Sequence, residues 1–229
     1  MEEGNPTNEE WIQTWKGDVS QFHLNQVHPS LQKHCDQLTG GKPNQRIFVP
    51  LCGKSLDIIW LAERGHCVVG AEISVDAITS FFKEHNLNYS REVIEMGNTD
   101  GLPSGAAVYK ALEKDITLFE CDIFKLTSDH TGFKFDAIHD IGAFVALMGE
   151  KQTDYVKAVS PLLAPHGRWL IETYDWDPTD PVAEADVHKI FSKDFNIHLV
   201  EKRKFTGAEA LPTYDEELEV YLFCLTKKK

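Results

Sequence analysis

The stretch FVPLCGKSLDIIWLAERGHCVVGAEIS, residues 48–74, decides the fold. It predicts a buried strand over residues 46–50, a tight turn, a helix over 55–64 and a second buried strand over 67–73. Gly65 stands where a glycine commonly ends a helix. Both strands are apolar without alternation, which is typical of parallel strands covered by helices on both faces. The stretch therefore predicts a strand–helix–strand unit within a parallel sheet.

Strands and helices alternate through the rest of the chain. Further strands are expected over residues 135–139, 168–174, 196–205 and 218–226, and further helices over 75–85, 151–163 and 183–191, with APHG ending the second of these helices. Residues 107–122 predict either a hairpin or one short strand followed by another. Amphipathic helices around residues 8–16 and 29–38 come first. We expect a doubly wound α/β fold, and a single domain over residues 1–229, since no repeat or linker divides the chain.

Composition excludes several classes of protein. The chain has 229 residues and a formal net charge of −13, which argues against nucleic acid as a partner. Its five cysteines are odd in number and include no C-x-x-C pair, so free thiols in a reducing compartment are expected. The acidic N-terminus resembles no targeting peptide, and no apolar run approaches the roughly 20 residues of a membrane span. We therefore expect a cytoplasmic protein.

The residues that follow the strands are the candidates for ligand binding, because ligands of such sheets bind beyond the strands' carboxyl ends. Glu72 ends the second strand, and an acidic side chain there is suited to accept hydrogen bonds from ribose hydroxyls, although a carboxylate in water or at a helix cap is the alternative. A ribose of NAD, FAD or S-adenosylmethionine fits this position equally well.

The loop after the first strand separates these cofactors. Its sequence LCGKSL has one glycine, Gly53, whereas a dinucleotide loop needs more to bring backbone close to a pyrophosphate, and no glycine precedes Gly53 at the Walker spacing. S-adenosylmethionine has no phosphate. The loop therefore favours a methyl donor over a dinucleotide.

Two later strand ends offer further candidates. Asp122 could receive an adenine amino group with Ile123 packed on the ring, or be an ordinary turn aspartate. His139 and Asp140 could act as a general base, or His139 could be a structural histidine. No other histidine or cysteine has ligand spacing to His139, so no metal is expected, and no signature of a nucleophile accompanies Cys52.

An aromatic segment precedes the first strand. Trp11 and Trp15 are spaced i and i+4, on one face of the predicted helix, and Phe22 and His23 follow. These side chains could simply pack on the domain. Together they would also form a lid that excludes water from a methyl transfer.

With these residues assembled, the chain resembles the thiopurine S-methyltransferase family. The likeness runs from about residue 10 to 178, through EEWIQTW, Phe22–His23, PLCGK, AERGHCVVGAEIS, FFKEHNLNYS, CDIF and FDAIHDIGAFVAL. It implies a monomeric, cytosolic class I methyltransferase that uses S-adenosylmethionine and releases S-adenosylhomocysteine. The implied fold is a mostly parallel seven-stranded sheet with an antiparallel C-terminal strand and an N-terminal helical lid over residues 1–40.

The resemblance also implies roles for individual residues. By position, Trp11, Trp15 and Phe22 would cover the cofactor and substrate. Leu51 and Gly53 would face the methionine end of the cofactor. Glu72 would bind the ribose, and Asp122 and Ile123 would contact the adenine.

Two departures fall on the substrate side, where Phe22, His23 and Ile141 are expected. The family has an arginine where this chain has Ile141, and a Gly-Pro-Pro-Phe segment after the fifth strand is missing. We therefore expect methyl transfer to a small thiol other than a thiopurine, with Asp140 orienting the acceptor and His139 as proton acceptor. The alternatives are a nitrogen, oxygen, selenium or halide acceptor, or cofactor binding without turnover.

Overall fold

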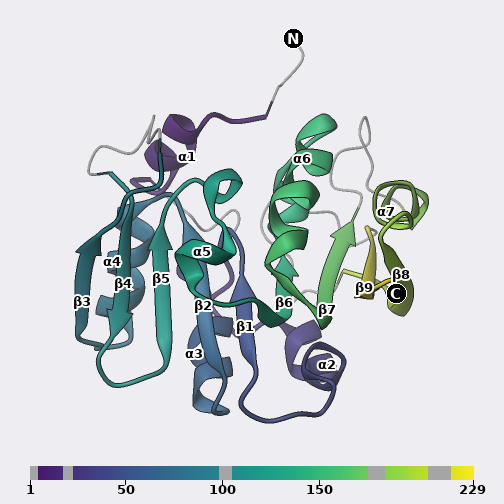
Figure 1. Ribbon diagram of the computed structural model, residues 1–229, viewed down its shortest axis with the longest axis horizontal. Coiled ribbons are helices and arrows are strands. Elements are labelled where there is room, and N and C mark those ends of the chain that lie inside the picture. The colour runs from purple at the N-terminus through teal and green to yellow at the C-terminus, as the bar shows by residue number, and fades with distance from the viewer. Residues whose placement is uncertain (1–4, 18–22, 98–104, 175–183, 206–217) are drawn as a thin grey trace.

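The sheet has nine strands in the computed structural model, which describes residues 5–17, 23–97, 105–174, 184–205 and 218–229. Strand order within these ranges is β3-β4-β5-β2-β1-β6-β7-β9-β8 (Figure 1). The five central strands are parallel: β5 (Ile116–Glu120), β2 (Cys67–Glu72), β1 (Arg46–Val49), β6 (Phe135–Ile141) and β7 (Leu163–Tyr174). Antiparallel strands flank them, with β3 (Tyr89–Val93) and β4 (Ala107–Ala111) at one edge and β9 (Glu219–Lys227) and β8 (Phe195–Lys204) at the other.

Helices cover both faces of this sheet. Buried residues of α2 (Pro29–Thr39), α3 (Leu56–Glu63) and α4 (Val75–Glu84) pack on one face, and those of α6 (Glu150–Val159) and α7 (Glu184–Phe191) on the other. The remaining helical segments are short: α1 (Asn8–Thr14), η1 (Ile123–Lys125), α5 (Ser128–Thr131), η2 (Phe144–Ala146) and η3 (Ser160–Leu162). Figure 1 shows α1 beyond the ends toward which the arrows of β5 and β7 point. No helix among the described residues is long and apolar enough to cross a membrane.

Strand β1 shows why its sequence lacks alternation. Ile47 and Val49 belong to the core beneath α2, α3 and α4, while Phe48 belongs to the core beneath α6 and α7. Three consecutive residues are thus buried on alternating faces, as expected for a strand between two helical layers. The prediction of a doubly wound, mostly parallel sheet is confirmed.

The order of the strands also places the ligand crevice. From β1, the chain adds β2 and β5 on one side and β6 and β7 on the other. Strand order therefore reverses between β1 and β6, and their carboxyl ends open the crevice in which ligands of such folds bind.

Local sequence signals locate the central helices correctly. Ser55 accepts a hydrogen bond from the backbone N–H of Asp57 (3.2 Å) at the start of α3, and Ser74 accepts one from Ala77 (3.3 Å) at the start of α4. Such caps satisfy backbone donors that have no partner within the helix. The predicted boundaries of both helices agree with the structure to within one residue at each end.

Three expectations differ from the structure. The sheet has nine strands within the described ranges rather than seven, because residues 107–122 form the hairpin alternative and β3 pairs with its outer strand. Strand β3 has the sequence YSREV, exposed throughout, so it lacks the apolar pattern of a strand. The APHG sequence lies inside β7 instead of ending a helix. A lid over residues 1–40 is too long, because Leu31 and Leu38 of α2 are fully buried in the core.

Candidate active site

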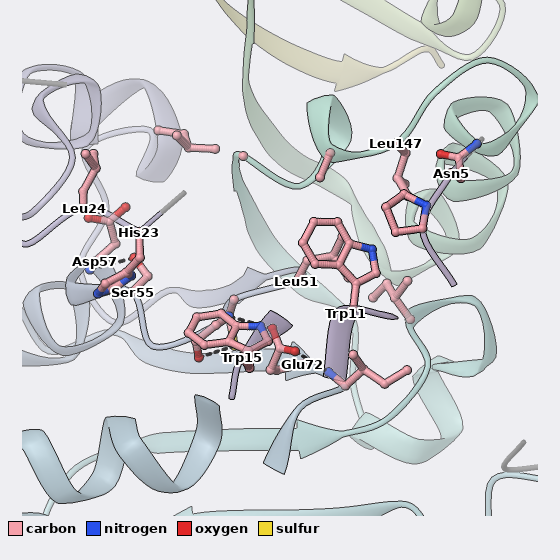
Figure 2. Close-up of a pocket in the computed structure, with 18 of the residues that line it drawn as sticks. Asn5, Trp11, Trp15, His23, Leu24, Leu51, Ser55, Asp57, Glu72 and Leu147 are labelled. Atoms are coloured by element: carbon pink, nitrogen blue, oxygen red, sulfur yellow. Dashed lines mark hydrogen bonds between the residues drawn. The ribbon is translucent and has the colours of Figure 1, made fainter. Parts of the chain in front are cut away.

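A cavity of about 500 Å³ opens at the carboxyl ends of the parallel strands. It is lined by residues that follow β1, β2 and β5, by residues at the ends of β6 and β7, and by α1 with the segment before it. Figure 2 shows its labelled side chains in two groups, with His23, Leu24, Ser55 and Asp57 at one end and Trp11, Trp15, Glu72 and Leu147 toward the other. The cavity therefore spans the crevice at which strand order reverses.

The loop after β1 comes closest to α1 at Gly53. Leu51 and Gly53 have positive φ angles of 43° and 50°, a backbone conformation that is costly for leucine and easy for glycine. A Cβ atom on Gly53 would lie 2.6 Å from Cζ2 of Trp15. The single glycine thus allows both the turn and the close packing of the indole on the loop.

Glu72 is a buried carboxylate with one place left for a ligand. Its Oε1 accepts hydrogen bonds from the backbone N–H groups of Ile73 and Ser74, both at 2.8 Å, and its Oε2 accepts one from Gly53 at 2.9 Å. Since a carboxylate oxygen accepts about two hydrogen bonds, Oε2 retains one position for a hydroxyl donor. Burial raises the pKa of Glu72, and the three backbone donors oppose that rise only in part.

The segment after β5 provides an apolar wall. Asp122 Oδ1 accepts a hydrogen bond from the backbone N–H of Phe124 (3.0 Å) and so starts η1, while Ile123 is 4 % exposed. The ring of Phe124 lines the cavity, with Nζ of Lys151 4.9 Å from its centroid. Asp122 thus makes the hydrogen bond of a turn and also lines the cavity with Ile123 and Phe124, so its contact with an adenine stays a prediction.

The N-terminal segment closes the cavity over this floor. Asn5 makes two hydrogen bonds with the backbone of Met148, donating to its carbonyl (3.0 Å) and accepting from its N–H (2.7 Å). Trp11 and Trp15 line the cavity, and the ring centroids of Trp15 and His23 lie 6.4 Å apart. Residues 5–17 thus supply one wall of the cavity, and a role as a lid stays a prediction; Phe22 lies outside the described residues.

The structure contradicts direct catalytic contact by His139 and Asp140. Asp140 is fully buried and accepts hydrogen bonds from the N–H of Phe144 (3.0 Å), the hydroxyl of Tyr155 (2.8 Å) and Nε1 of Trp169 (3.0 Å). His139 is 1 % exposed. Neither belongs to the cavity lining in the described chain, whereas Ile141 and Gly142 do. Position along β6 explains this, since His139 and Asp140 lie inside the strand whereas Ile141 and Gly142 lie at its carboxyl end, where the crevice opens.

His139 reaches the cavity only through Asp57. Its Nε2 lies 2.7 Å from Oδ2 of Asp57, and Oδ1 of Asp57 accepts the backbone N–H of His28 at 2.8 Å. Burial alone raises the pKa of Asp57, but the hydrogen bond and charge of His139, with those of His28, outweigh it and hold that pKa below its usual value. His139 is therefore a positioning residue for Asp57.

The sequence reasoning missed a polar cluster at the end of β7. Glu172, 1 % exposed, lines the cavity; its Oε2 accepts hydrogen bonds from Oγ of Ser30 and from Nη2 of Arg203 (3.2 Å), and its Oε1 lies 3.5 Å from Nε2 of His28. One signal was available: Glu172 interrupts the apolar run WLIETY of a strand expected to be buried. The residues that pair with Glu172 gave no such signal, because they lie far from it in the sequence.

Cysteine and metal chemistry find no support in this cavity. Burial raises the pKa of the Cys52 and Cys121 thiols, and the charge of nearby carboxylates raises both further. Both are therefore protonated near neutral pH and are poor nucleophiles. Among the residues that the structure describes, no group of three His, Cys, Asp or Glu side chains could hold a metal ion.

Comparison with known proteins agrees with this architecture. The family model "Thiopurine S-methyltransferase (TPMT)" matches residues 6–218. The chain belongs to the thiopurine S-methyltransferase family. It is 39% identical over 202 residues to the thiopurine S-methyltransferase of Panthera leo, with 86% of this chain and 80% of that protein covered, and 38% identical to that of Bos taurus at the same coverage.

Solved structures show the same fold at low identity. The N-methyltransferase NodS from Bradyrhizobium japonicum WM9, in complex with S-adenosyl-L-homocysteine, has a TM-score of 0.60 and 14% identity, covering 95% of this chain and 98% of that one. Magnesium protoporphyrin IX methyltransferase from Synechocystis PCC 6803 has a TM-score of 0.56 and 15% identity, covering 98% and 95%. The protein is thus a class I S-adenosylmethionine-dependent methyltransferase, of a family of S-methyltransferases acting on small molecules. The predicted cofactor, reaction class and fold are confirmed.

Proposed function

We propose that this enzyme methylates the sulfur of a small thiol, with the cofactor across the ends of β1, β2 and β5 and the acceptor at the ends of β6 and β7. The observation that supports it best is Glu72, whose Oε2 keeps one acceptor position beside a loop with a single glycine, Gly53, on which Trp15 packs closely. A ligand with a ribose and no phosphate at this loop fits both features.

We assign the cofactor contacts accordingly. Glu72 would accept a ribose hydroxyl, Leu51 and Gly53 would face the methionine, and Ile123 would pack on the adenine with Asp122 ordering the turn beside it. Trp11 and Trp15 would cover the cofactor; both line the cavity. His23 and Ile141 line it as well and are proposed on the acceptor side with Phe22, whose role rests on the sequence alone.

The charge of the cavity lining also suits S-adenosylmethionine. When bound, S-adenosylmethionine supplies an electrophilic methyl group on a positive sulfonium, which the acceptor sulfur attacks in line. The carboxylates of Asp57, Glu72, Asp122 and Glu172 all line the cavity and give it a negative field that favours a cationic group. The lid would exclude water and hold the reacting groups in line.

The acceptor needs little help from a base. A free thiol has a pKa of about 8.5, so a useful fraction is ionised near neutral pH and its proton passes to solvent. His139 and Asp140 would act by position: His139 orients Asp57 at the wall, and Asp140 holds Phe144, Tyr155 and Trp169 behind the strand end. Neither residue would transfer a proton to or from the acceptor directly, because both are buried outside the described cavity lining.

The remaining expectations on context are part of the proposal. Residues 1–229 would act as one methyltransferase domain and as a monomer in the reducing cytoplasm, without a nucleic-acid partner. The support is the net charge of −13 and five free cysteines. Size-exclusion chromatography with light scattering tests the monomer, and a dimer mass would contradict it.

Replacing Glu72 tests the cofactor assignment. Glu72→Ala should weaken binding of S-adenosylhomocysteine, measured by calorimetry, by about tenfold or more, since a hydrogen bond to a charged group is lost. Because three backbone donors also lose their partner, Glu72→Gln is made alongside, and thermal unfolding of both variants is recorded. Glu120→Gln is the matched control: it is also a buried carboxylate at a strand end, 1 % exposed, outside the cavity lining of the described chain. Unchanged affinity in both Glu72 variants would refute the ribose assignment.

A further inference from the structure

Few positively charged side chains line the cavity in the described chain. Lys151 is the one lysine or arginine among its described lining residues, and it lies over the ring of Phe124 on the side proposed for the adenine. Outside the described ranges the sequence contains no lysine, arginine or histidine, while it contains several aspartates and glutamates. No part of the chain that the structure leaves undescribed can therefore bring a cationic side chain to the acceptor.

At the acceptor end, two buried carboxylates face this cation-poor space. Glu172 on β7 is the register partner of Ile141 on β6, so its carboxylate stands beside the strand end proposed for the acceptor. Asp57 joins it through His28, whose backbone N–H bonds Asp57 and whose Nε2 lies 3.5 Å from Glu172 Oε1. The two carboxylates thus form one wall from residues of β7, α3 and the start of α2.

Both carboxylates are held by partners within the fold, and both residues belong to the described cavity lining. Glu172 Oε2 takes the hydrogen bonds of Ser30 and Arg203, and Arg203 does not belong to the described lining although Glu172 does. Oε1 has only the long contact with His28 and therefore keeps acceptor positions. His139 supports Asp57 in the same manner, at 2.7 Å.

His28 and His23 also line this end of the cavity. His28 Nδ1 accepts the backbone N–H of Ser30 at 3.3 Å, so the proton of a neutral ring lies on Nε2, toward Glu172. Burial lowers the pKa of His23, and the charge of Lys54 lowers it further. The described acceptor end therefore presents carboxylate oxygens as hydrogen-bond acceptors.

We propose that the acceptor is a small thiol that also bears a protonated amine, with the ammonium group bound by Glu172 and favoured by the charge of Asp57. This inference rests on the proposed S-methylation and narrows its substrate class. An ammonium group offers three donors, and hydrogen bonds between ionised partners are about twice as strong as neutral ones. A carboxylate-bearing thiol would instead meet the carboxylates of Glu172 and Asp57, while Arg203, the cation paired with Glu172, is outside the described cavity lining.

Three thiols of matched size test the preference. Methyl transfer from labelled cofactor is measured with 2-aminoethanethiol, 2-mercaptoethanol and mercaptoacetate, and kcat/KM is expressed per thiolate after each thiol is titrated spectroscopically. The expected order is amine above alcohol above carboxylate. Preference for the carboxylate thiol would overturn the inference and leave S-methylation standing.

Two variants assign the preference to this wall. Glu172→Gln should lower the ratio of kcat/KM for the amine over the alcohol about tenfold, a comparison in which the thiol pKa values cancel. Glu201→Gln is the control, because Glu201 is bound by Lys33 and His34 away from the cavity. Ile141→Arg should raise the ratio of kcat/KM for the carboxylate thiol over the alcohol thiol. Because this substitution breaks no buried ion pair, it provides a test even where Glu172→Gln fails to fold.

The behaviour of the Glu172→Gln variant and the binding of the three thiols give further tests of the inference. An unchanged ratio in a folded Glu172→Gln variant, or a variant that loses cofactor affinity while keeping its acceptor preference, would overturn the inference. If no thiol is methylated, binding of the three thiols to the protein with S-adenosylhomocysteine is measured by calorimetry. Preferential binding of the amine would then support the acidic wall and refute S-methylation, whereas equal binding would refute both.

Discussion

The half of the cavity beside β1, β2 and β5 is built from neighbours in sequence, whereas the half beside β6 and β7 is built from distant ones. Glu72 accepts hydrogen bonds from residues 1, 2 and 19 positions away. Around Asp57 and Glu172 the corresponding separations are 29, 82 and 142 residues. The first half, where we propose the cofactor, is built around backbone N–H groups, and the second, where we propose the acceptor, is built from side chains of distant segments.

The contrast has a physical basis. Backbone N–H groups at a strand end and a helix start are supplied by any sequence that folds there, so a single carboxylate and one glycine complete the cofactor half. The acceptor half relies on a carboxylate inside a sheet, which must be paired when it is buried. Serine and arginine from α2 and β8 meet that requirement only after the sheet and its outer layer have assembled.

The largest expected effect is on stability, and it tests whether Asp140 has a packing role or a catalytic role. Asp140→Ala would leave the donors of Phe144, Tyr155 and Trp169 buried without a partner. Each costs about 1–3 kcal/mol, so the free energy of unfolding in urea should fall by at least about 3 kcal/mol. Asp154→Ala, at an exposed position of α6, should change it by about 0.5 kcal/mol or less. A stable but inactive Asp140→Ala variant would return Asp140 to a catalytic role.

The next effect tests the close approach in the cofactor half. Gly53→Ala should lower the affinity for S-adenosylhomocysteine by roughly tenfold or more, about 1.4 kcal/mol, because the new Cβ would displace Trp15. Gly132→Ala shares the strain of positive φ, at 77°, but has no atom within 4 Å of its added Cβ. Both variants should lose about 1–2 kcal/mol of stability, and equal loss of affinity in both would show that strain alone is responsible.

A smaller effect concerns the pair of His139 and Asp57, and it depends on pH. The pKa of Asp57 is lowered in the folded protein, so the stability that it contributes is present above its ordinary pKa of about 4 and is lost as the pH falls through the folded value. His139→Gln should remove about 1–2 kcal/mol of unfolding free energy near neutral pH. Urea unfolding of both proteins across the acid range should show this difference shrinking toward low pH; a difference that grows there would contradict the pairing.

The smallest effect concerns the lid, which spans both halves. Asn5→Ala removes the two part-buried hydrogen bonds to Met148 and should weaken cofactor affinity by about fivefold, since the net energy of such bonds is only about 1 kcal/mol. Asn196→Ala, on the outer strand β8, is the control for an exposed asparagine. If the Asn5 variant binds S-adenosylhomocysteine as tightly as the parent in calorimetry, the tie to Met148 plays no part in closing the lid.

Sequence reasoning was strongest where structure is local. It located β1, α3, β2 and α4 to within a residue or so at each end, and it placed Leu51, Gly53 and Glu72 in one cavity. It failed at β3, whose exposed residues carry no periodic pattern, and at residues 163–167, where a turn-rich sequence continues a strand. It also chose His139 and Asp140 over their neighbours, although position along β6 puts Ile141 in the cavity and Asp140 among buried donors.

What this sequence determined by itself is the cofactor half. An apolar strand, one glycine and an acid at the next strand end specify it, because partners within 19 residues are brought together by a single strand–helix–strand unit. Only the tertiary structure decided the acceptor half. Asp57, His28, Glu172 and Arg203 meet because β6 and β7 lie beside β1 and because β8 and α2 close over them. Contacts across so many residues leave no local pattern in the chain, so their chemistry becomes visible only when the sheet is complete.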